Sequence, residues 1–247
     1  MPSIDIIGVR ISLYGICLAT AFLLCLLLFS QEAKKMNCSF EHATVIATLV
    51  TGSALLGAYL LHHMVSALPN QSASSETGFV LYGGLVAGFF CTFPICRIYN
   101  LDAWDVLDRI ASIIPIGQAI GRIGCFCVGC CFGMPTESLF HVVYSNPEAR
   151  APLNIPLIPV QIYEALFDVM LFSVLFRVFK KKKAKHLTSL IYLLCYVSFR
   201  FFIEFFRGDA VRGYFLNLST SQWISLLFLP FAFYLLIRMK RNKVLSE

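Results

Sequence analysis

One stretch of the sequence, residues 117–133 (GQAIGRIGCFCVGCCFG), combines residue types that could do chemistry inside a membrane. It places Arg122 in an otherwise apolar segment and packs Cys125, Cys127, Cys130 and Cys131 into seven residues. A cation at membrane depth is costly, so it normally faces a protein interior or a water-filled cavity and has a partner there. Five glycines in the same stretch let a backbone or a ligand approach closely. The stretch therefore predicts the functional site.

The four clustered cysteines admit several interpretations. They could be packing residues in a glycine-rich kink, a structural or redox-active disulfide on the outer face, or a nucleophilic thiolate, because Arg122 lies three residues before Cys125. A metal or iron–sulfur site fits the residue type. However, adjacent Cys130 and Cys131 and the tight spacing differ from paired C-x2-C motifs, so we predict no metal and no cofactor.

Residues 196–207 (YVSFRFFIEFFR) place polar side chains along one predicted helix. Arg200 and Glu204 are four residues apart and share a helix face. Tyr196 lies one turn earlier, and we place Arg207 about one further turn along the same stripe. The pattern predicts a polar seam whose other sides are covered by phenylalanines.

Glu164, in the stretch PVQIYEAL, adds a second intramembrane carboxylate, with Gln161 one turn before it. Buried ion pairs that only fix helix packing are one explanation of these charges. Two arginines and two glutamates on three helices favour a site for a lipid phosphate or a similar anion, because the planar guanidinium binds phosphate oxygens bidentately. The glutamates would hold the guanidiniums in place, or one of them would act as a base.

The elements that position these residues are membrane helices. The chain has 247 residues, of which 58% are hydrophobic and 14% charged, and its mean hydropathy is +0.74. This composition indicates one polytopic membrane domain over residues 1–247. The net charge of +6 does not indicate nucleic-acid binding, because the lysines cluster at the ends of apolar segments and contact the lipid bilayer.

Seven apolar stretches are long enough to span a bilayer, which predicts an all-α fold. The fourth stretch carries Pro115 and several glycines, so we expect a broken helix around residues 115–133. The predicted outer loops cover about residues 66–78, 134–158 and 207–220. The seven predicted helices cover about residues 11–29, 43–64, 79–99, 104–126, 159–179, 187–206 and 222–237.

The distribution of lysine and arginine predicts the orientation. With the N-terminus outside, thirteen of these residues fall on the cytoplasmic side and at most four on the outer side. Cytoplasmic loops carry the excess of Lys and Arg, so the sequence predicts an N-out, C-in topology. The site would then lie toward the outer leaflet.

Several motifs in register resemble the prolipoprotein diacylglyceryl transferases. The stretch Gly121–Phe126 (GRIGCF) is similar to the family signature, and residues 82–85 (YGGL) are similar to its His-Gly-Gly-Leu. Residues 159–166, 196–207 and 218–226 resemble its later blocks. The resemblance runs from about Tyr14 to the C-terminus and implies seven transmembrane helices with an N-out, C-in topology.

The resemblance implies a reaction at the outer face of the bacterial cytoplasmic (inner) membrane. Such enzymes transfer diacylglycerol from phosphatidylglycerol to the thiol of a lipobox cysteine in the signal peptide of a preprolipoprotein, and glycerol phosphate leaves. It implies that Arg122 and Arg200 bind the lipid head group and that Glu164 and Glu204 orient them. Further residues implied in substrate binding are Tyr14, Gly83, Gly84, Gly121, Gly124, Gln161, Tyr196 and Arg207.

Three positions depart from the family pattern. Tyr82 stands where the family has a histidine proposed as a base, and a tyrosine is a poor base at neutral pH. Cys125 replaces an asparagine, and Cys130 replaces a glutamate. Tyr82, Cys125 and Cys130 therefore join the candidate catalytic set. Three other functions stay open: a divergent lipid-modifying transferase with cysteine chemistry or another acceptor, a non-catalytic lipid carrier, and a membrane thiol–disulfide protein.

Overall fold

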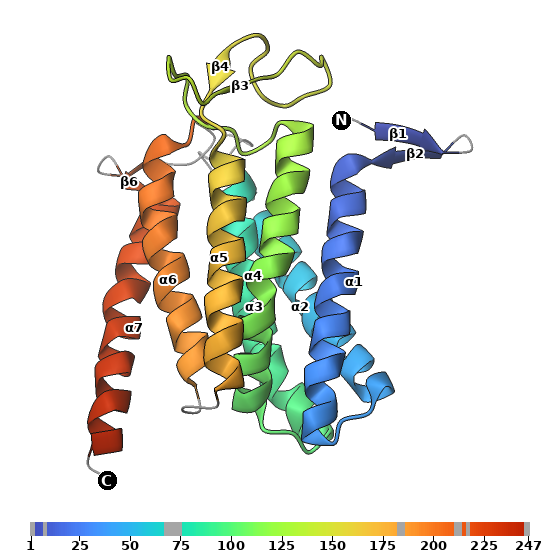
Figure 1. Ribbon diagram of the computed structural model, residues 1–247, viewed down its shortest axis with the longest axis vertical. Coiled ribbons are helices and arrows are strands. Elements are labelled where there is room, and N and C mark those ends of the chain that lie inside the picture. Colours follow the sequence, from blue (N-terminus) through green and yellow to red (C-terminus); the bar gives the residue numbers. More distant parts are fainter. Residues whose placement is uncertain are drawn as a thin grey trace.

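The structure is a computed structural model, which describes residues 3–6, 9–66, 76–181, 186–209, 214–215 and 218–244. Over these ranges, seven α-helices form an elongated bundle, with three two-stranded antiparallel sheets at one end (Figure 1). We call this end, which holds the loop between α4 and α5, the upper end. The helices are α1 (Leu13–Ala33), α2 (Phe40–Ser66), α3 (Glu76–Ile98), α4 (Ala103–Val128), α5 (Val160–Lys180), α6 (Leu187–Ile203) and α7 (Thr220–Val244).

Shorter elements complete the fold. Two 3-10 turns follow α1 and α6, at Lys34–Met36 and Glu204–Phe206. The sheets pair β1 (Ser3–Ile6) with β2 (Val9–Ser12), β3 (Val142–Val143) with β4 (Pro156–Leu157), and β5 (Tyr214–Phe215) with β6 (Leu218–Ser219).

The seven predicted helical segments are all helical in the structure, and most boundaries agree within a few residues. The first helix was expected at Ile11 but begins at Leu13. Residues Val9–Ser12 instead pair with Ser3–Ile6 in an antiparallel hairpin. This pairing satisfies backbone hydrogen bonds that a longer helix would otherwise satisfy.

Five helices within the described ranges are long and apolar enough to cross a membrane, namely α1, α2, α4, α6 and α7. In α3, the part whose side chains the structure describes, Gly83–Ile98, is apolar. The helix α5 falls outside this set and carries three buried polar residues, Gln161, Glu164 and Asp168. Polar side chains that face the interior of a bundle lower the mean hydropathy of a helix, but they do not expose charge to lipid.

The expected break in the fourth helix at Pro115 is wrong. The helix α4 is continuous from Ala103 to Val128 and leaves the helical conformation only at Gly129, which has a φ of 68°. Asp102 caps its first turn by accepting a hydrogen bond from the Trp104 N–H at 2.9 Å. Pro115 is fully buried, and membrane helices tolerate proline where neighbouring helices cover the freed backbone group.

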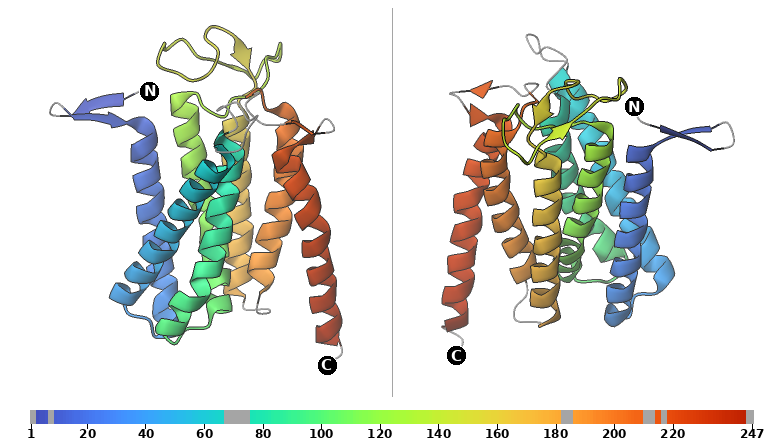
Figure 2. Two further views of the ribbon diagram at one scale, coloured as in Figure 1. Left: turned by 180° about the vertical axis from the view of Figure 1, so that it is seen from behind. Right: turned by 45° about the horizontal axis from the view of Figure 1, so that its top comes forward.

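Glycines bring α2 and α3 unusually close, and the two helices lie together on the back of the bundle (Figure 2). A Cβ atom on Gly83 would lie 2.6 Å from the carbonyl oxygen of Gly57, and one on Gly84 would lie 3.0 Å from that of Ala54. Small residues let membrane helices pack backbone to backbone. Gly83 and Gly84 therefore have a packing role in the contact with α2.

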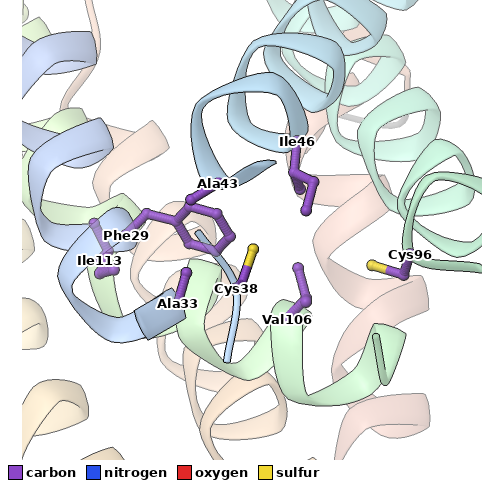
Figure 3. Packing of buried hydrophobic residues seen from close by; sticks show 8 residues of the cluster. All are labelled: Phe29, Ala33, Cys38, Ala43, Ile46, Cys96, Val106 and Ile113. Atoms are coloured by element: carbon purple, nitrogen blue, oxygen red, sulfur yellow. The ribbon is translucent and has the colours of Figure 1, made fainter. Parts of the chain in front are cut away.

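The main hydrophobic core lies at the lower end of the bundle, where the last turn of α1 meets the first turns of α2 and α4 (Figure 3). Phe29 packs there with Ala43 and Ile113, and Ile46 with Val106 and Cys96. Cys96 and Cys38 are buried among these side chains as small apolar residues, as expected for a thiol inside a helical bundle.

A buried ion cluster closes the same lower end. Glu32 of α1 accepts hydrogen bonds from Lys35 at 2.8 Å and from Lys180 of α5 at 2.6 Å. Arg109 of α4 donates to the Glu32 carbonyl oxygen at 2.8 Å and pairs with Asp105 at 3.0 Å. The cluster ties three helices together far from the upper end.

Candidate active site

Three guanidinium groups converge on one carboxylate near the upper end of α5. Glu164 Oε2 lies 3.2 Å from Arg122 Nη1 of α4. Glu164 Oε1 lies 3.1 Å from Arg200 Nη1 of α6 and 3.6 Å from Arg207 Nη1. The Glu164 side chain is only 4% exposed. The structure thus brings Arg122, Arg200 and Glu164 together, as the sequence predicted.

Two further carboxylates compensate two of the three arginines. Glu204 Oε2 lies 2.6 Å from Arg200 Nη2, across one turn of α6. Asp209 accepts two hydrogen bonds from Arg207, at 2.9 Å and 2.7 Å. These bidentate and charge-assisted contacts fix the planes of both guanidinium groups. The sequence analysis missed Asp209, although its position two residues after Arg207 was a signal.

Arg122 is the least compensated of the three. Its ion pair among the described residues is with Glu164, which it shares with both other arginines. Its side chain is 19% exposed, against 7% for Arg200 and 3% for Arg207. Arg122 is therefore the guanidinium with both charge and access left for an anionic ligand.

Arg207 reaches Glu164 from outside the helix, which corrects the expectation that it continues the stripe of α6. The α-helix ends at Ile203, the 3-10 turn ends at Phe206, and Arg207 is extended, with a φ of −80° and a ψ of 137°. A backbone bridge links it to Gly133. The turn thus redirects its side chain to the Glu164 carboxylate.

The segment around Gly133 and Gly208 holds Arg207 in place. The Met134 N–H donates to the Phe206 carbonyl oxygen at 2.9 Å, and the Gly208 N–H donates to the Phe132 carbonyl oxygen at 3.0 Å. A Cβ atom on Gly208 would lie 2.5 Å from the Gly133 carbonyl oxygen. Real Cβ atoms do not approach a backbone that closely, so glycine is required at this crossing.

The loop between α4 and α5, expected as a polar loop over residues 134–158, lies at the upper end of the bundle (Figure 1) and contains the pairing of β3 with β4. Tyr144 packs with Ala151 and Leu157 in a small core of its own. The Tyr144 hydroxyl donates to the Phe126 carbonyl oxygen at 3.1 Å, and burial raises the pKa of Tyr144 to about 12. Tyr144 therefore stays a protonated donor that anchors the loop to the end of α4.

Gln161 joins this loop to the site, because its Nε2 donates to the Cys130 carbonyl oxygen at 2.8 Å. Two buried polar atoms nearby, Gln161 Oε1 and the Tyr196 hydroxyl, have no hydrogen-bond partner among the described residues. Buried polar groups are nearly always hydrogen-bonded. Their presence beside Arg122 suits a place that polar substrate atoms occupy.

Asp168 extends the polar interior one turn below Glu164 on α5, and sequence reasoning missed it. Asp168 is 4% exposed and lies within electrostatic range of Arg122 and Glu164. Its spacing of four residues from Glu164 was the available signal, because it places both carboxylates on one helix face.

The remaining predicted site residues fall in two places. Gly124 of α4 packs against Tyr14 of α1, where an added Cβ atom would lie 3.2 Å from a Tyr14 ring carbon. At Gly121, an added Cβ atom would meet no atom within 4 Å. Tyr82 belongs to α3, but its side chain lies outside the part of the chain that the structure describes. Substrate contacts at these positions stay predictions.

Three of the four clustered cysteines meet just above the end of α4. The sulfur atoms of Cys125, Cys130 and Cys131 all lie within 4.8 Å of one another, whereas Cys127 is exposed. Every cysteine of the chain is described, and each is a free thiol. The structure therefore shows no disulfide in the cluster.

Cys131 is the most acidic member of the cluster and was absent from the predicted catalytic set. Hydrogen bonding with Cys125 and Cys130 holds the pKa of the Cys131 thiol well below its usual range. The guanidinium groups of Arg207 and Arg122 act in the same direction. The arginines of the site therefore lie close enough to the thiol cluster for their charges to act on it.

Comparisons with known proteins place the chain in a family. The family model described as "Prolipoprotein diacylglyceryl transferase" matches residues 2–238. A phosphatidylglycerol–prolipoprotein diacylglyceryl transferase of Clostridium tetani is 35% identical over 228 residues, which cover 90% of each chain. Proteins of the same description from Clostridium perfringens (its second such enzyme) and Rickettsia conorii are 31% and 33% identical. The matches cover 91% and 83% of this chain, and 90% and 80% of theirs.

Proposed function

Because the chain belongs to the prolipoprotein diacylglyceryl transferase family, we propose that it transfers a diacylglyceryl group from phosphatidylglycerol to a lipobox cysteine. The acceptor is the thiol in the signal peptide of a preprolipoprotein. The products are a thioether-linked lipid on the protein and glycerol phosphate. The reaction takes place at the outer face of a bacterial cytoplasmic membrane.

The observation that carries this proposal is the convergence of three guanidinium groups on Glu164. Glu204 and Asp209 pair with Arg200 and Arg207, so Arg122, which within the described residues only shares Glu164, is the guanidinium left to bind a phosphodiester. A planar guanidinium presents paired N–H groups that match phosphate oxygens. Inside a membrane protein, where water is scarce, such donors act with little screening. This arrangement suits an anionic phospholipid head group.

Arg122 contacts the phosphate, and Arg200 and Arg207 strengthen the positive field behind it. The acceptor sulfur attacks the glyceryl carbon, the carbon–oxygen bond to the phosphate breaks, and the bond electrons leave with that oxygen. Negative charge therefore grows on the leaving phosphate. Preorganised donors aimed at developing charge lower the barrier most, because they need no reorganisation during the reaction.

Glu164 and Glu204 position the arginines instead of contacting the lipid. Glu204 holds the Arg200 plane within one helical turn, and Glu164 links α4 to α6 through α5. The unpartnered hydroxyl of Tyr196 and the Gln161 oxygen provide polar contacts for the head-group glycerol.

The membrane topology belongs to the same proposal. Residues 1–247 form one domain with seven membrane spans, the N-terminus outside, and outer loops at about 66–78, 134–158 and 207–220. Lys34, Lys35, Arg97, Arg177 and Lys180 all belong to the lower ends of their helices, which supports a cytoplasmic lower end. The helix α5, which is not among the helices apolar enough to span a membrane by themselves, packs against α4.

The test is a transfer assay on purified protein in detergent with phosphatidylglycerol labelled in its acyl chains. The acceptor is a lipobox peptide, and the control is the same peptide with its cysteine replaced by serine. We expect label on the cysteine peptide alone, with release of glycerol phosphate. Label that remains on the enzyme, or release without peptide transfer, would contradict the proposed acceptor and favour a divergent transferase. No turnover with an intact fold would contradict the proposal.

A further inference from the structure

The thiols of Cys125, Cys130 and Cys131 form a cluster that the arginine site does not use. Their three sulfur atoms lie within 4.8 Å of one another. Cys125 lies in the last turn of α4 and is 8% exposed, while Cys130 and Cys131 follow the left-handed Gly129. Three sulfurs from seven consecutive residues can meet only because the chain reverses sharply at this point.

The backbone at Cys131 is held in an uncommon conformation. Its φ is 57°, in the left-handed region, which for a residue with a Cβ atom costs about 1 kcal/mol. Such outliers persist only where the surroundings over-determine them, and they cluster at functional sites. Here the adjoining hydrogen bonds of Phe132 and Met134 to the segment 206–208 hold the turn. The strained turn brings the third sulfur to the other two.

Three sulfur atoms, which are soft ligands, suit a metal ion better than a disulfide. A disulfide joins two sulfurs and leaves the third without a role. Three thiolates with an open fourth position are a ligand set that Zn²⁺ accepts readily. At a Zn–S distance of about 2.3 Å, sulfurs in tetrahedral positions lie roughly 3.8 Å apart, so a contraction of less than about 1 Å completes the site.

We propose that Cys125, Cys130 and Cys131 bind one zinc ion and leave its fourth position for the thiol of the acceptor peptide. This departs from the sequence expectation of no metal, which the tight cysteine spacing suggested. The part that concerns the acceptor rests on the proposed transferase function, whereas the metal site does not.

Charge balance supports the site. Three thiolates around Zn²⁺ leave a net negative charge, and a bound substrate thiolate adds another. Arg122 and Arg207 lie within electrostatic range of Cys131, and Arg122, which shares the Glu164 carboxylate with both other arginines, offsets this charge. An uncompensated anionic centre at this depth would be unstable. The neighbouring guanidinium group of Arg122 stabilises it.

The zinc site explains how the acceptor reacts without the family histidine, whose place Tyr82 takes. Coordination removes the proton from a thiol, and that proton passes to solvent. The coordinated sulfur attacks the glyceryl carbon, the carbon–oxygen bond breaks, and glycerol phosphate departs beside Arg122. The thioether product is neutral and a weak ligand for zinc, so it leaves the fourth position.

The first test measures metal content. The full-length protein in detergent is incubated with Zn²⁺, desalted, and analysed by mass spectrometry of the elements; we expect about one zinc per chain. Cys131→Ser should lower the zinc affinity by roughly tenfold to a hundredfold or more. The matched control is Cys127→Ser, which changes an exposed thiol of the same stretch. Equal zinc retention in wild type and Cys131→Ser, or no zinc in either, would overturn the site.

A second measurement keeps the test valid if a variant folds poorly. Replacement of zinc by Co²⁺ in the wild-type protein should produce intense sulfur-to-metal charge-transfer absorption. The lipobox peptide should then shift the visible cobalt bands, and its serine counterpart should not. If the cobalt bands do not shift when the cysteine peptide is added, the fourth position does not bind the acceptor thiol and that role is overturned. Melting curves of each cysteine variant, measured without metal, show whether the fold is retained.

Chelation separates this proposal from the proposed function. Removal of zinc should slow diacylglyceryl transfer by roughly a hundredfold, and added zinc should restore it. If metal-free protein transfers lipid at an unchanged rate, the transferase function stands and the role of zinc is overturned. If zinc binds in stoichiometric amount and lipid is never transferred, the metal site stands and the transferase function fails.

Discussion

Arg200 and Glu164 lie 3.1 Å apart across the contact between α6 and α5, and both side chains are almost completely buried. The same carboxylate holds Arg122 of α4 at 3.2 Å, so one acidic residue joins three helices. A buried carboxylate with several guanidinium partners is stable only as a complete set, because each partner offsets the desolvation of the others. The site is therefore a structural joint as well as the place where we propose that an anion binds.

Replacing Arg122 by lysine should reduce diacylglyceryl transfer by about a hundredfold to a thousandfold while leaving the fold intact. Lysine keeps the charge but loses the planar set of donors. The measurement is the transfer assay together with gel filtration and thermal unfolding in detergent. The control is Arg97→Lys, which changes an exposed arginine at the lower end. Retention of more than half the wild-type rate in Arg122→Lys would contradict the phosphate role.

Glu164→Gln should destabilise the protein by about 3–5 kcal/mol, because it leaves buried guanidinium groups without their shared partner. Thermal unfolding in detergent measures the loss. Glu137→Gln, an exposed change in the upper loop, is the control and should leave the melting temperature unchanged. A Glu164→Gln protein as stable as the control would show that the ion cluster contributes little to the fold.

Gly208→Ala should weaken both folding and transfer, because its Cβ atom would lie 2.5 Å from the Gly133 carbonyl oxygen. The backbone must move apart, which costs about 1–3 kcal/mol and shifts Arg207 away from Glu164. The unfolding temperature and the KM for phosphatidylglycerol check this expectation. Gly52→Ala provides the comparison, since an added Cβ atom there meets no atom within 4 Å. Equal unfolding temperatures and equal KM values for the two variants would contradict the close contact between Gly208 and Gly133.

Glu32→Gln should lower stability without lowering the turnover number. Glu32 binds Lys35, Lys180 and Arg109 at the lower end, far from the arginine site. Because Lys35 and Lys180 are about half exposed, the loss should cost less than at Glu164, about 1–3 kcal/mol. The measurement compares the melting temperature with kcat at a temperature where the variant is folded. Glu41→Gln, an exposed change at the start of α2, should alter neither quantity. A fall in kcat in proportion to the fall in stability would tie this cluster to the reaction.

The helical segments, the family, and the charged side chains that meet at the proposed site could be predicted from the sequence alone. Long apolar stretches must become helices in lipid, because every backbone group there needs an internal partner. Charged residues inside those stretches must meet, because no other partner exists at that depth. Arg122, Glu164, Arg200 and Glu204 could therefore be chosen without coordinates. The spacing of Arg200 and Glu204 also predicted their contact, because four residues make about one helical turn.

The ends of the helices and the contacts between distant segments depend on the tertiary structure. The helix α4 continues through Pro115 because neighbouring helices cover the proline. Gly83 allows α3 to pack closely against α2. Neither feature follows from the local sequence pattern. Arg207 and Asp209 join the site through the crossing of Gly133 and Gly208, which are 75 positions apart in the sequence numbering. Cys131 meets two other thiols through a left-handed turn. Local periodicity carries no information about such contacts, because they depend on the packing of segments that are remote in sequence.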